Sequence, residues 1–254
     1  MVGRMYIVAN KKLMKSIQPD FTKDAVSLMQ KADAGDAEAQ YKFATYLLRE
    51  PSDYSYRKDI SPDEVERGLR YLQKAATQGY YHGIAADELG MIYYRGEITP
   101  KDYKKAKLWF NTALMKGIPT AAYHLGECAY YGYDEDVDFE KAATYYLQVA
   151  PQYVNALIRI ADMYLRGEYF PLDPSFANEL YEHVRISEEW FYRKNKIFSD
   201  ANDMVFERIE EMKRSDIVYP PSPLNEAEKQ RAAREKLLEI MERDKERWEK
   251  WGDS

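Results

Sequence analysis

The chain has 254 residues, of which 45% are hydrophobic and 31% charged, and its formal net charge is −6 at pH 7. This composition is typical of a folded protein, and the acidic balance argues against a nucleic-acid partner, which requires a basic face. No apolar run approaches the roughly 20 residues that span a bilayer, so we expect no membrane partner. Cys128 is the only cysteine, which excludes an intrachain disulfide and favours a cytoplasmic location.

The N-terminal residues 1–25 carry a weak helical pattern. We expect them to form an N-terminal cap, because the segment from Phe21 to Ala34 has the pattern of the second helix of a truncated unit. Residues 26–190 then form a repetitive region of about four units.

The repeats are clearest between Ala85 and Ala161, where one pattern recurs about every 36 residues. A Leu-Gly step is followed by glycine six residues after it and then by an Asp-x-x-Lys-Ala step. Repetition at this period is typical of a solenoid, in which each unit buries its apolar face against its neighbours. The equivalent steps are Phe43-Ala44, Leu89-Gly90, Leu125-Gly126 and Ile160-Ala161.

The spacings of these steps are 46, 36 and 35 residues, so the first unit carries an insertion, Pro51–Ile60. Glycine inside a helix costs about 1 kcal/mol relative to alanine, and its recurrence at Gly90 and Gly126 predicts close helix–helix approach. The first helices are expected to end at Gly96, Gly132 and Gly167 in left-handed caps. The second helices have N-terminal capping signals at Ser61, Asp102, Asp138 and Asp173.

This pattern resembles the Sel-1-like repeat, a variant of the tetratricopeptide superfamily built from helix-turn-helix units of about 36 residues. The copy from Ala85 to Gly117 matches nearly every signature position, and the resemblance covers about two thirds of the chain. It implies an all-α, right-handed solenoid and a protein that acts as an adaptor or scaffold. It also implies that the first helix of each unit lines a concave groove.

Four positions per unit are then expected to face that groove, at −2, +2, +5 and +6 relative to the leucine. They carry many tyrosines and arginines, which are enriched at binding hot spots. A tyrosine-rich floor edged by arginines would suit a peptide with carboxylates or a helix with acidic edges. Alternatively, the rings pack between units and the arginines simply end helices. The candidate binding residues are Tyr41, Arg49, Asp87, Tyr94, Arg95, Tyr123, Glu127, Tyr130, Tyr131, Asp162 and Arg166.

The C-terminal part divides into three predicted segments. Residues 191–215 are expected to be capping helices, and residues 216–224, which contain three prolines, an extended linker. Residues 225–254 read as a highly charged amphipathic helix with an apolar stripe. This helix could fold back on the solenoid, or it could dock Trp248 and Trp251 on a partner or on a second copy of the chain.

The sequence gives no positive evidence for catalysis, a cofactor or a metal. The acidic loop from Asp134 to Glu140 lacks the glycine and the final glutamate of a calcium loop. His124 and Cys128 share a helix face, but no orienting group accompanies them. We therefore expect a non-enzymatic protein-interaction module. The alternatives are an inhibitor or immunity-type protein that sequesters a toxic enzyme, or an enzyme that uses Glu127 and Asp162.

Overall fold

The computed structural model describes residues 25–50, 55–78, 82–195, 205, 207–210 and 228–252, with the backbone alone for 190–195, 251 and 252. Apart from one isolated bridge, the regular elements in these ranges are helical, so the predicted all-α repeat solenoid is confirmed. No helix in the same ranges is both long and apolar enough to cross a membrane. The helices are α2 (Ala25–Asp33), α3 (Ala37–Leu48), α4 (Pro62–Ala75), α5 (His82–Arg95), α6 (Tyr103–Met115), α7 (Pro119–Tyr131), α8 (Phe139–Val149), α9 (Val154–Arg166), α10 (Pro174–Asn195) and α12 (Glu228–Gly252).

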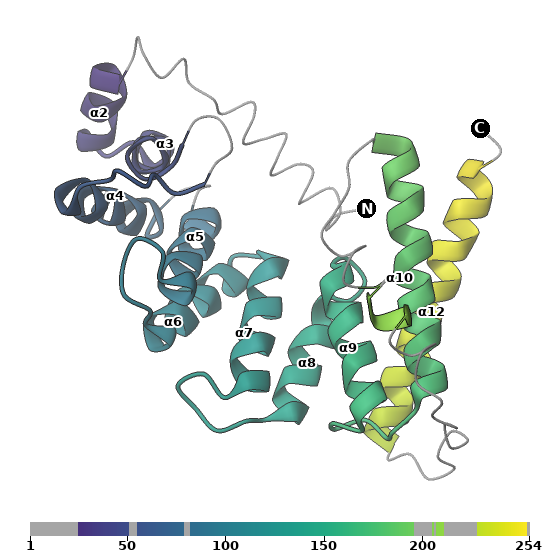
Figure 1. Cartoon of the computed structure of the whole chain (residues 1–254). Helices are drawn as coiled ribbons and strands as arrows, with labels where there is room; N and C mark the ends of the chain where they lie inside the picture. The colour runs from purple at the N-terminus through teal and green to yellow at the C-terminus, as the bar shows by residue number, and fades with distance from the viewer. Residues whose placement is uncertain are drawn as a thin grey trace. The chain divides into compact units, whose positions relative to one another are not determined.

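The chain divides into two compact units, residues 1–137 and 138–254. The division falls inside the third repeat, between α7 and α8. In the first unit, α3 packs on α4 and α5 on α6 as consecutive hairpins, and α7 packs on α6 (Figure 1). In the second unit, α9 packs on both α8 and α10.

Close helix–helix approach explains the glycine inside α5. A Cβ atom added to Gly90 would lie 2.5 Å from the ring of Phe110, which is itself fully buried in α6. Alanines fill the other contact positions of this hairpin, including Ala86, Ala106 and Ala113, which are fully buried. The recurrent small residues therefore set the distance between the two helices of a repeat, as predicted.

The predicted helix ends are also confirmed. Asp102 and Asp138 each accept a hydrogen bond from the backbone N–H three residues later, at 2.9 Å. Ser61 and Glu64 form the reciprocal capping box of α4. The glycines after α5, α7 and α9 adopt φ values of 67–69°, which favour glycine over residues with a Cβ.

The insertion in the first repeat folds back on the end of α3. Arg49 and Tyr56 form an isolated antiparallel bridge, in which Glu50 N–H donates to Ser55 and Arg57 N–H donates to Leu48. Residues 51–54 lie outside the described part. The insertion thereby holds the Tyr56 side chain, which is buried, beside Arg49.

The second unit differs from the sequence prediction in one element. The repetitive region was expected to end at residue 190 and to be followed by separate capping helices, yet α10 continues to Asn195. No glycine or proline follows Pro174 within this helix, so nothing in its sequence ends it. Most of the capping segment 191–215, all of the linker 216–224 and the N-terminal residues 1–24 lie outside the described residues.

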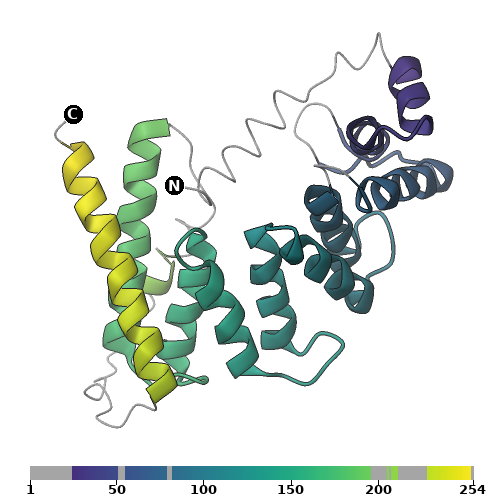
Figure 2. The same cartoon turned by 180° about the vertical axis from the view of Figure 1, so that it is seen from behind.

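The charged C-terminal helix packs on the second unit, where α12 lies alongside α10 in both views (Figure 2). Ala233, Leu237 and Ile240 are buried at spacings of four and three, which places one face of α12 on its neighbours. Arg234 pairs with Asp173 at 2.7 Å and stacks over the Phe176 ring at 4.1 Å. Of the two alternatives for this helix, the structure shows the one in which it folds back.

Candidate functional site

The candidate residues of the first unit lie on the first helices of three repeats, α3, α5 and α7. We call this set the A-helix face. Its members differ in exposure: Arg95 and Tyr131 at +6 are exposed, whereas Arg49 at +6 and the residues at +5 are half-buried or buried. The A-helix face comprises Tyr41, Thr45, Arg49, Asp87, Met91, Tyr94, Arg95, Tyr123, Glu127, Tyr130 and Tyr131.

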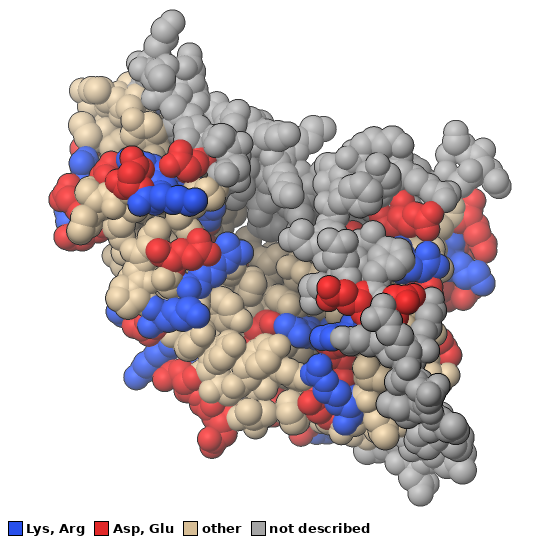
Figure 3. Space-filling model, in the orientation of Figure 1, with Lys and Arg blue, Asp and Glu red and all other residues tan. Residues whose placement is uncertain are grey.

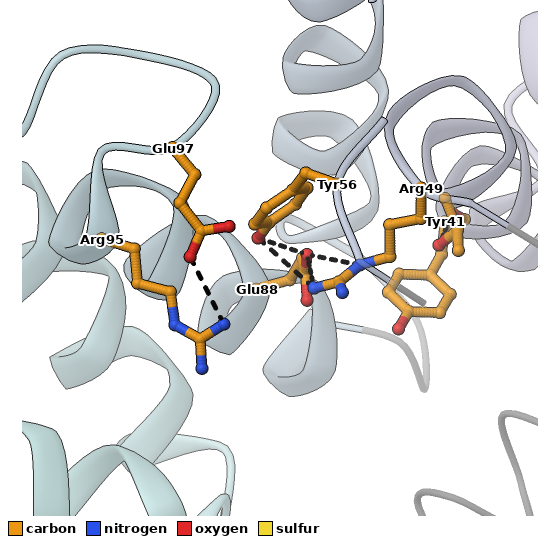
Figure 4. A network of polar contacts seen from close by, with 7 residues as sticks. Tyr41, Arg49, Tyr56, Glu88, Arg95 and Glu97 are labelled. Carbon is orange, nitrogen blue, oxygen red and sulfur yellow. Dashed lines mark hydrogen bonds and ion pairs between the residues drawn. The ribbon is translucent and has the colours of Figure 1, made fainter. Parts of the chain in front are cut away.

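A polar network joins α3, the insertion and α5 (Figure 4). The Nε atom of Arg49 donates to the Oε1 atom of Glu88 at 3.0 Å, and a second guanidinium nitrogen also contacts that oxygen. The Tyr56 hydroxyl donates to the same oxygen at 2.9 Å, and the Arg49 guanidinium lies 4.5 Å from the centre of the Tyr56 ring. Burial, and then the charge of Glu88, raises the pKa of Tyr56, so its hydroxyl remains a donor.

In this network the charge of Arg49 is already paired, whereas the sequence placed Arg49 on an open rim of the groove. Arg95, by contrast, is half exposed and makes a longer contact with Glu97, at 3.7 Å. The two side chains point toward each other from the end of α5 and from the loop that follows (Figure 4). Basic and acidic side chains lie next to one another elsewhere on the visible face as well (Figure 3).

Beside Arg95 lies a cluster of four tyrosines from the end of α5, the start of α6 and the end of α7. We call Tyr94, Tyr103, Tyr131 and Tyr133 the tyrosine cluster. The rings of Tyr103 and Tyr133 stack with centroids 4.2 Å apart, Tyr131 stacks on Tyr133 at 5.4 Å, and Tyr94 meets Tyr133 edge-on at 5.9 Å. Tyr131 keeps 43% of its surface exposed, and the other three rings are half-buried.

The cluster rests on residues that are packed against the core of this unit. The His124 ring stacks on Phe110 at 4.9 Å and also contacts Tyr94. Burial, assisted by the charge of Arg95, lowers the pKa of His124 to about 3, so the ring is neutral at pH 7. Cys128 and Glu127 are buried, as are Tyr130, Tyr41 and Tyr123. These residues support the A-helix face more than they form its surface.

Asp87 is in an unusual environment for a carboxylate. Its Oδ2 atom accepts a hydrogen bond from the Thr120 hydroxyl at 3.3 Å, whereas its Oδ1 atom is buried and accepts none within the described residues. Burial, and then the adjacent charge of Glu88, raises the pKa of Asp87 to about 7. Within the described part of the first unit, this carboxyl group therefore has no cation beside it.

In the second unit, the candidates Asp162 and Arg166 both belong to α9 but differ in exposure. Asp162 is only 1% exposed, and its Oδ1 atom accepts from the Tyr181 hydroxyl at 2.6 Å and from Arg208 at 3.2 Å. The expectation that Asp162 faces an open groove is therefore not met, because the side chain of Arg208 reaches it from the segment after α10. Arg166, at the end of α9, is exposed.

Trp248 contacts the same unit, its ring centroid lying 5.0 Å from that of His183 on α10. His183 is buried and faces Asp244 of α12, with Nε2 and Oδ2 3.5 Å apart. Asp244 therefore belongs to the face of α12 that meets α10. The side chain of Trp251 lies outside the described part.

The acidic loop before α8 is held by structural contacts. Lys107 lies 3.5 Å from both Asp134 and Glu135, and Asp138 caps α8. An open cleft of about 680 Å³ lies elsewhere in the first unit, between the insertion, α4 and the loop after α5. Its apolar lining includes Ile60, Val65, Leu69 and Ile98.

Sequence reasoning missed Glu88, Tyr56, Tyr103 and Tyr133. Glu88 and Tyr103 do not occupy any of the four groove-facing positions of a repeat. Tyr56 lies in the insertion, and Tyr133 follows the C-terminal cap of α7. The only sequence signal for these aromatic residues was the high tyrosine content, 23 of 254 residues.

Comparison with known proteins supports the repeat assignment directly. The Sel1 repeat model matches residues 37–80, 83–118, 119–150 and 154–182, which together exceed half of the chain. The proteins named sel-1 homolog 2 from Homo sapiens and Rattus norvegicus are each 28% identical over 123 residues, which is 47% of this chain. The chain spans only 18% of the length of either relative.

Two solved structures share the fold. The Sel1 repeat protein from Oxalobacter formigenes has a TM-score of 0.57 at 21% identity, covering 85% of this chain and 75% of that one. The protective antigen c5321 of uropathogenic Escherichia coli, which displays an SLR fold, has a TM-score of 0.54 at 22% identity, covering 74% of this chain and 41% of that one. Sel1 repeat proteins generally mediate protein–protein interaction, and the fold is typically non-catalytic. Four repeats match the family model, and the structure has the helix pairs that such repeats form. The chain therefore belongs to the Sel1 repeat family.

Proposed function

We propose that this chain is a non-enzymatic protein-interaction module that binds a partner protein through the exposed part of the A-helix face in its first unit. The observation that carries the proposal is the tyrosine cluster beside Arg95. Tyrosine and arginine are the residue types enriched at binding hot spots, and partly exposed rings can bury apolar area while their hydroxyls form hydrogen bonds.

The packing of the cluster supports a binding role. Four rings hold one another in place through contacts between 4.2 and 5.9 Å, so little side-chain entropy remains to be lost when a partner binds. A pre-organised surface of this kind binds more tightly than one whose side chains must first be ordered. Arg95 adds a half-exposed cation whose contact with Glu97 is long enough to be exchanged for a partner.

The test is a pull-down from native extract with the purified chain as bait. The variant Arg95→Ala/Tyr131→Ala/Tyr133→Ala truncates the exposed part of the site and leaves the buried Tyr130 and His124 in place. A matched variant, Leu108→Ala/Met115→Ala, truncates two exposed side chains of α6 that lie outside the cluster. We expect the cluster variant to lose the partner that the wild type and the α6 variant retain. Equal retention by both variants would contradict the proposal.

A further inference from the structure

The A-helix face contains a carboxylate that no cation among the described residues neutralises. Asp87 projects from α5, and among the described residues its single hydrogen bond comes from the neutral hydroxyl of Thr120 in the first turn of α7. Its Oδ1 atom is buried without a donor. Buried carboxylates in folded proteins are ordinarily paired or hydrogen-bonded at both oxygens, because an unpaired one is costly to desolvate.

The nearest cations on this face are committed elsewhere. Arg49 contacts Glu88 with two of its nitrogens and stacks on Tyr56. Arg95 faces Glu97 at the far end of α5. Glu88 itself adds a repulsive charge next to Asp87. The sequence predicted a groove whose arginines receive carboxylates, whereas the structure presents an acidic group that no cation of the described residues pairs.

Aromatic rings stand at the equivalent positions of the two adjacent repeats. At the −2 position occupied by Asp87, the preceding repeat has Tyr41 and the following repeat has Tyr123. Both tyrosines are buried. Tyr41 is near enough to interact electrostatically with Asp87, and the Thr120 contact brings the first turn of α7, the helix that carries Tyr123, to the same carboxylate. A carboxylate that no cation pairs can recognise a basic side chain through charge-assisted hydrogen bonds.

We propose that Asp87 is the docking point for a lysine or arginine side chain of the partner. This inference rests on the proposed function, because the partner must lie along the A-helix face for its side chain to reach Asp87. It specifies the chemistry of that partner: the bound segment carries a basic residue at the position opposite α5. Burial of the unpaired carboxylate destabilises the chain when it is alone, and pairing with a cation of the partner offsets that loss of stability.

The size of the effect follows from buried charge pairs in protein interfaces. Removing one member of such a pair weakens binding by about thirtyfold or more. The substitution Asp87→Asn keeps the shape of the side chain and its acceptor for Thr120, and it removes only the charge. It also relieves an unfavourable burial, so the variant is expected to fold at least as well as the wild type.

The experiment uses the full chain and matched sets of 12-residue peptides that differ at one fixed central position. That position is arginine in the first set, citrulline in the second and glutamate in the third. Citrulline has nearly the shape of arginine but no charge. Binding to each set on an array is measured for the wild type, for Asp87→Asn, and for Asp63→Asn, which removes one exposed charge from the same unit.

We expect the wild type and Asp63→Asn to bind the best arginine peptides at least about tenfold more tightly than their citrulline counterparts. The Asp87→Asn variant should show a difference of less than about twofold. The inference is overturned if the wild type does not distinguish arginine from citrulline, if it prefers glutamate, or if Asp87→Asn keeps the preference.

The two proposals fail in different ways. If the cluster variant loses the partner but the chain shows no preference for arginine peptides, the proposed binding face stands and only the role of Asp87 is refuted. Retention of the partner by the cluster variant removes the binding face on which the role of Asp87 depends.

Discussion

Arg49 and Glu88, separated by 39 residues in sequence, form an ion pair that ties the first repeat to the second. Both side chains are largely buried, with 16% and 12% of their surfaces exposed. Removing one partner of a buried pair leaves the other charge desolvated and unpaired, which costs several kcal/mol. The pair therefore stabilises the junction on which the A-helix face is built.

We expect Arg49→Ala to destabilise the chain by about 2–4 kcal/mol, somewhat less than for a fully buried pair. Urea unfolding of Arg49→Ala, Glu88→Ala and the double variant measures the coupling between them. Arg70→Ala breaks the exposed pair with Glu66 on α4 and serves as the control, with an expected loss below about 0.5 kcal/mol. A loss for Arg49→Ala as small as for Arg70→Ala would show that the network contributes little.

The titration of Asp87 predicts a pH-dependent stability. Its pKa in the folded chain is about 7, against an ordinary value of 3.8 for an aspartate side chain, so between these values the folded state holds a proton that the unfolded state has already released. The favourable contribution is complete below about pH 4 and is lost as the pH rises through 7.

In Asp87→Asn this residue does not titrate. We expect the variant to be more stable than the wild type by about 2 kcal/mol at pH 8, a value reduced from the full shift because Asp87 keeps part of its surface exposed. The advantage should shrink toward pH 5 and vanish below pH 4. Urea unfolding at these three pH values checks the sign, and a difference that does not change with pH would be inconsistent with a raised pKa.

The contact between Gly90 and Phe110 predicts that alanine is not tolerated inside α5. Alanine is the better helix former by about 1 kcal/mol, yet its Cβ would lie 2.5 Å from a ring that has no exposed surface to move into. We expect Gly90→Ala to lower the free energy of unfolding by about 1–3 kcal/mol. Adding Phe110→Leu should restore part of that loss, and stabilisation by Gly90→Ala alone would refute the close packing.

The packing of α12 is tested by two adjacent leucines. Leu237 is fully buried, whereas Leu238 is 44% exposed. We expect Leu237→Ala to cost about 2–4 kcal/mol and to speed hydrogen exchange across α12, while Leu238→Ala leaves both nearly unchanged. Similar exchange rates in the two variants would mean that this face of α12 is not held against the second unit.

Much of the fold could be predicted because its determinants are local. Gly96 and Asp102 end and begin helices through bonds within a few residues, and Gly90 signals close packing through its own lack of a side chain. The length of α10 was missed because the end of a helix without glycine or proline depends on its tertiary contacts, which the sequence pattern does not contain.

The site was harder to predict because it depends on which charges meet across repeats. The spacing placed Arg49 and Asp87 on the A-helix face, but it could not show that Glu88, one residue away from a counted position, takes the charge of Arg49. Likewise, Asp162 accepts a hydrogen bond from Arg208, 46 residues later. Arg49 and Arg95 both stand at +6, yet Arg49 is half-buried and Arg95 is exposed, because the contacts that cover Arg49 lie outside the repeat pattern.

The central claim, that the tyrosine cluster contacts a partner, is tested most directly by site-specific photo-crosslinking. Benzoylphenylalanine is placed at position 133, within the cluster, or at position 108, on the exposed side of α6, and each protein is irradiated in native extract. We predict a discrete adduct from position 133 that position 108 does not give and that disappears when Arg95 and Tyr131 are both changed to alanine. The same adduct from both positions, or an adduct from position 133 that survives those substitutions, would contradict the account.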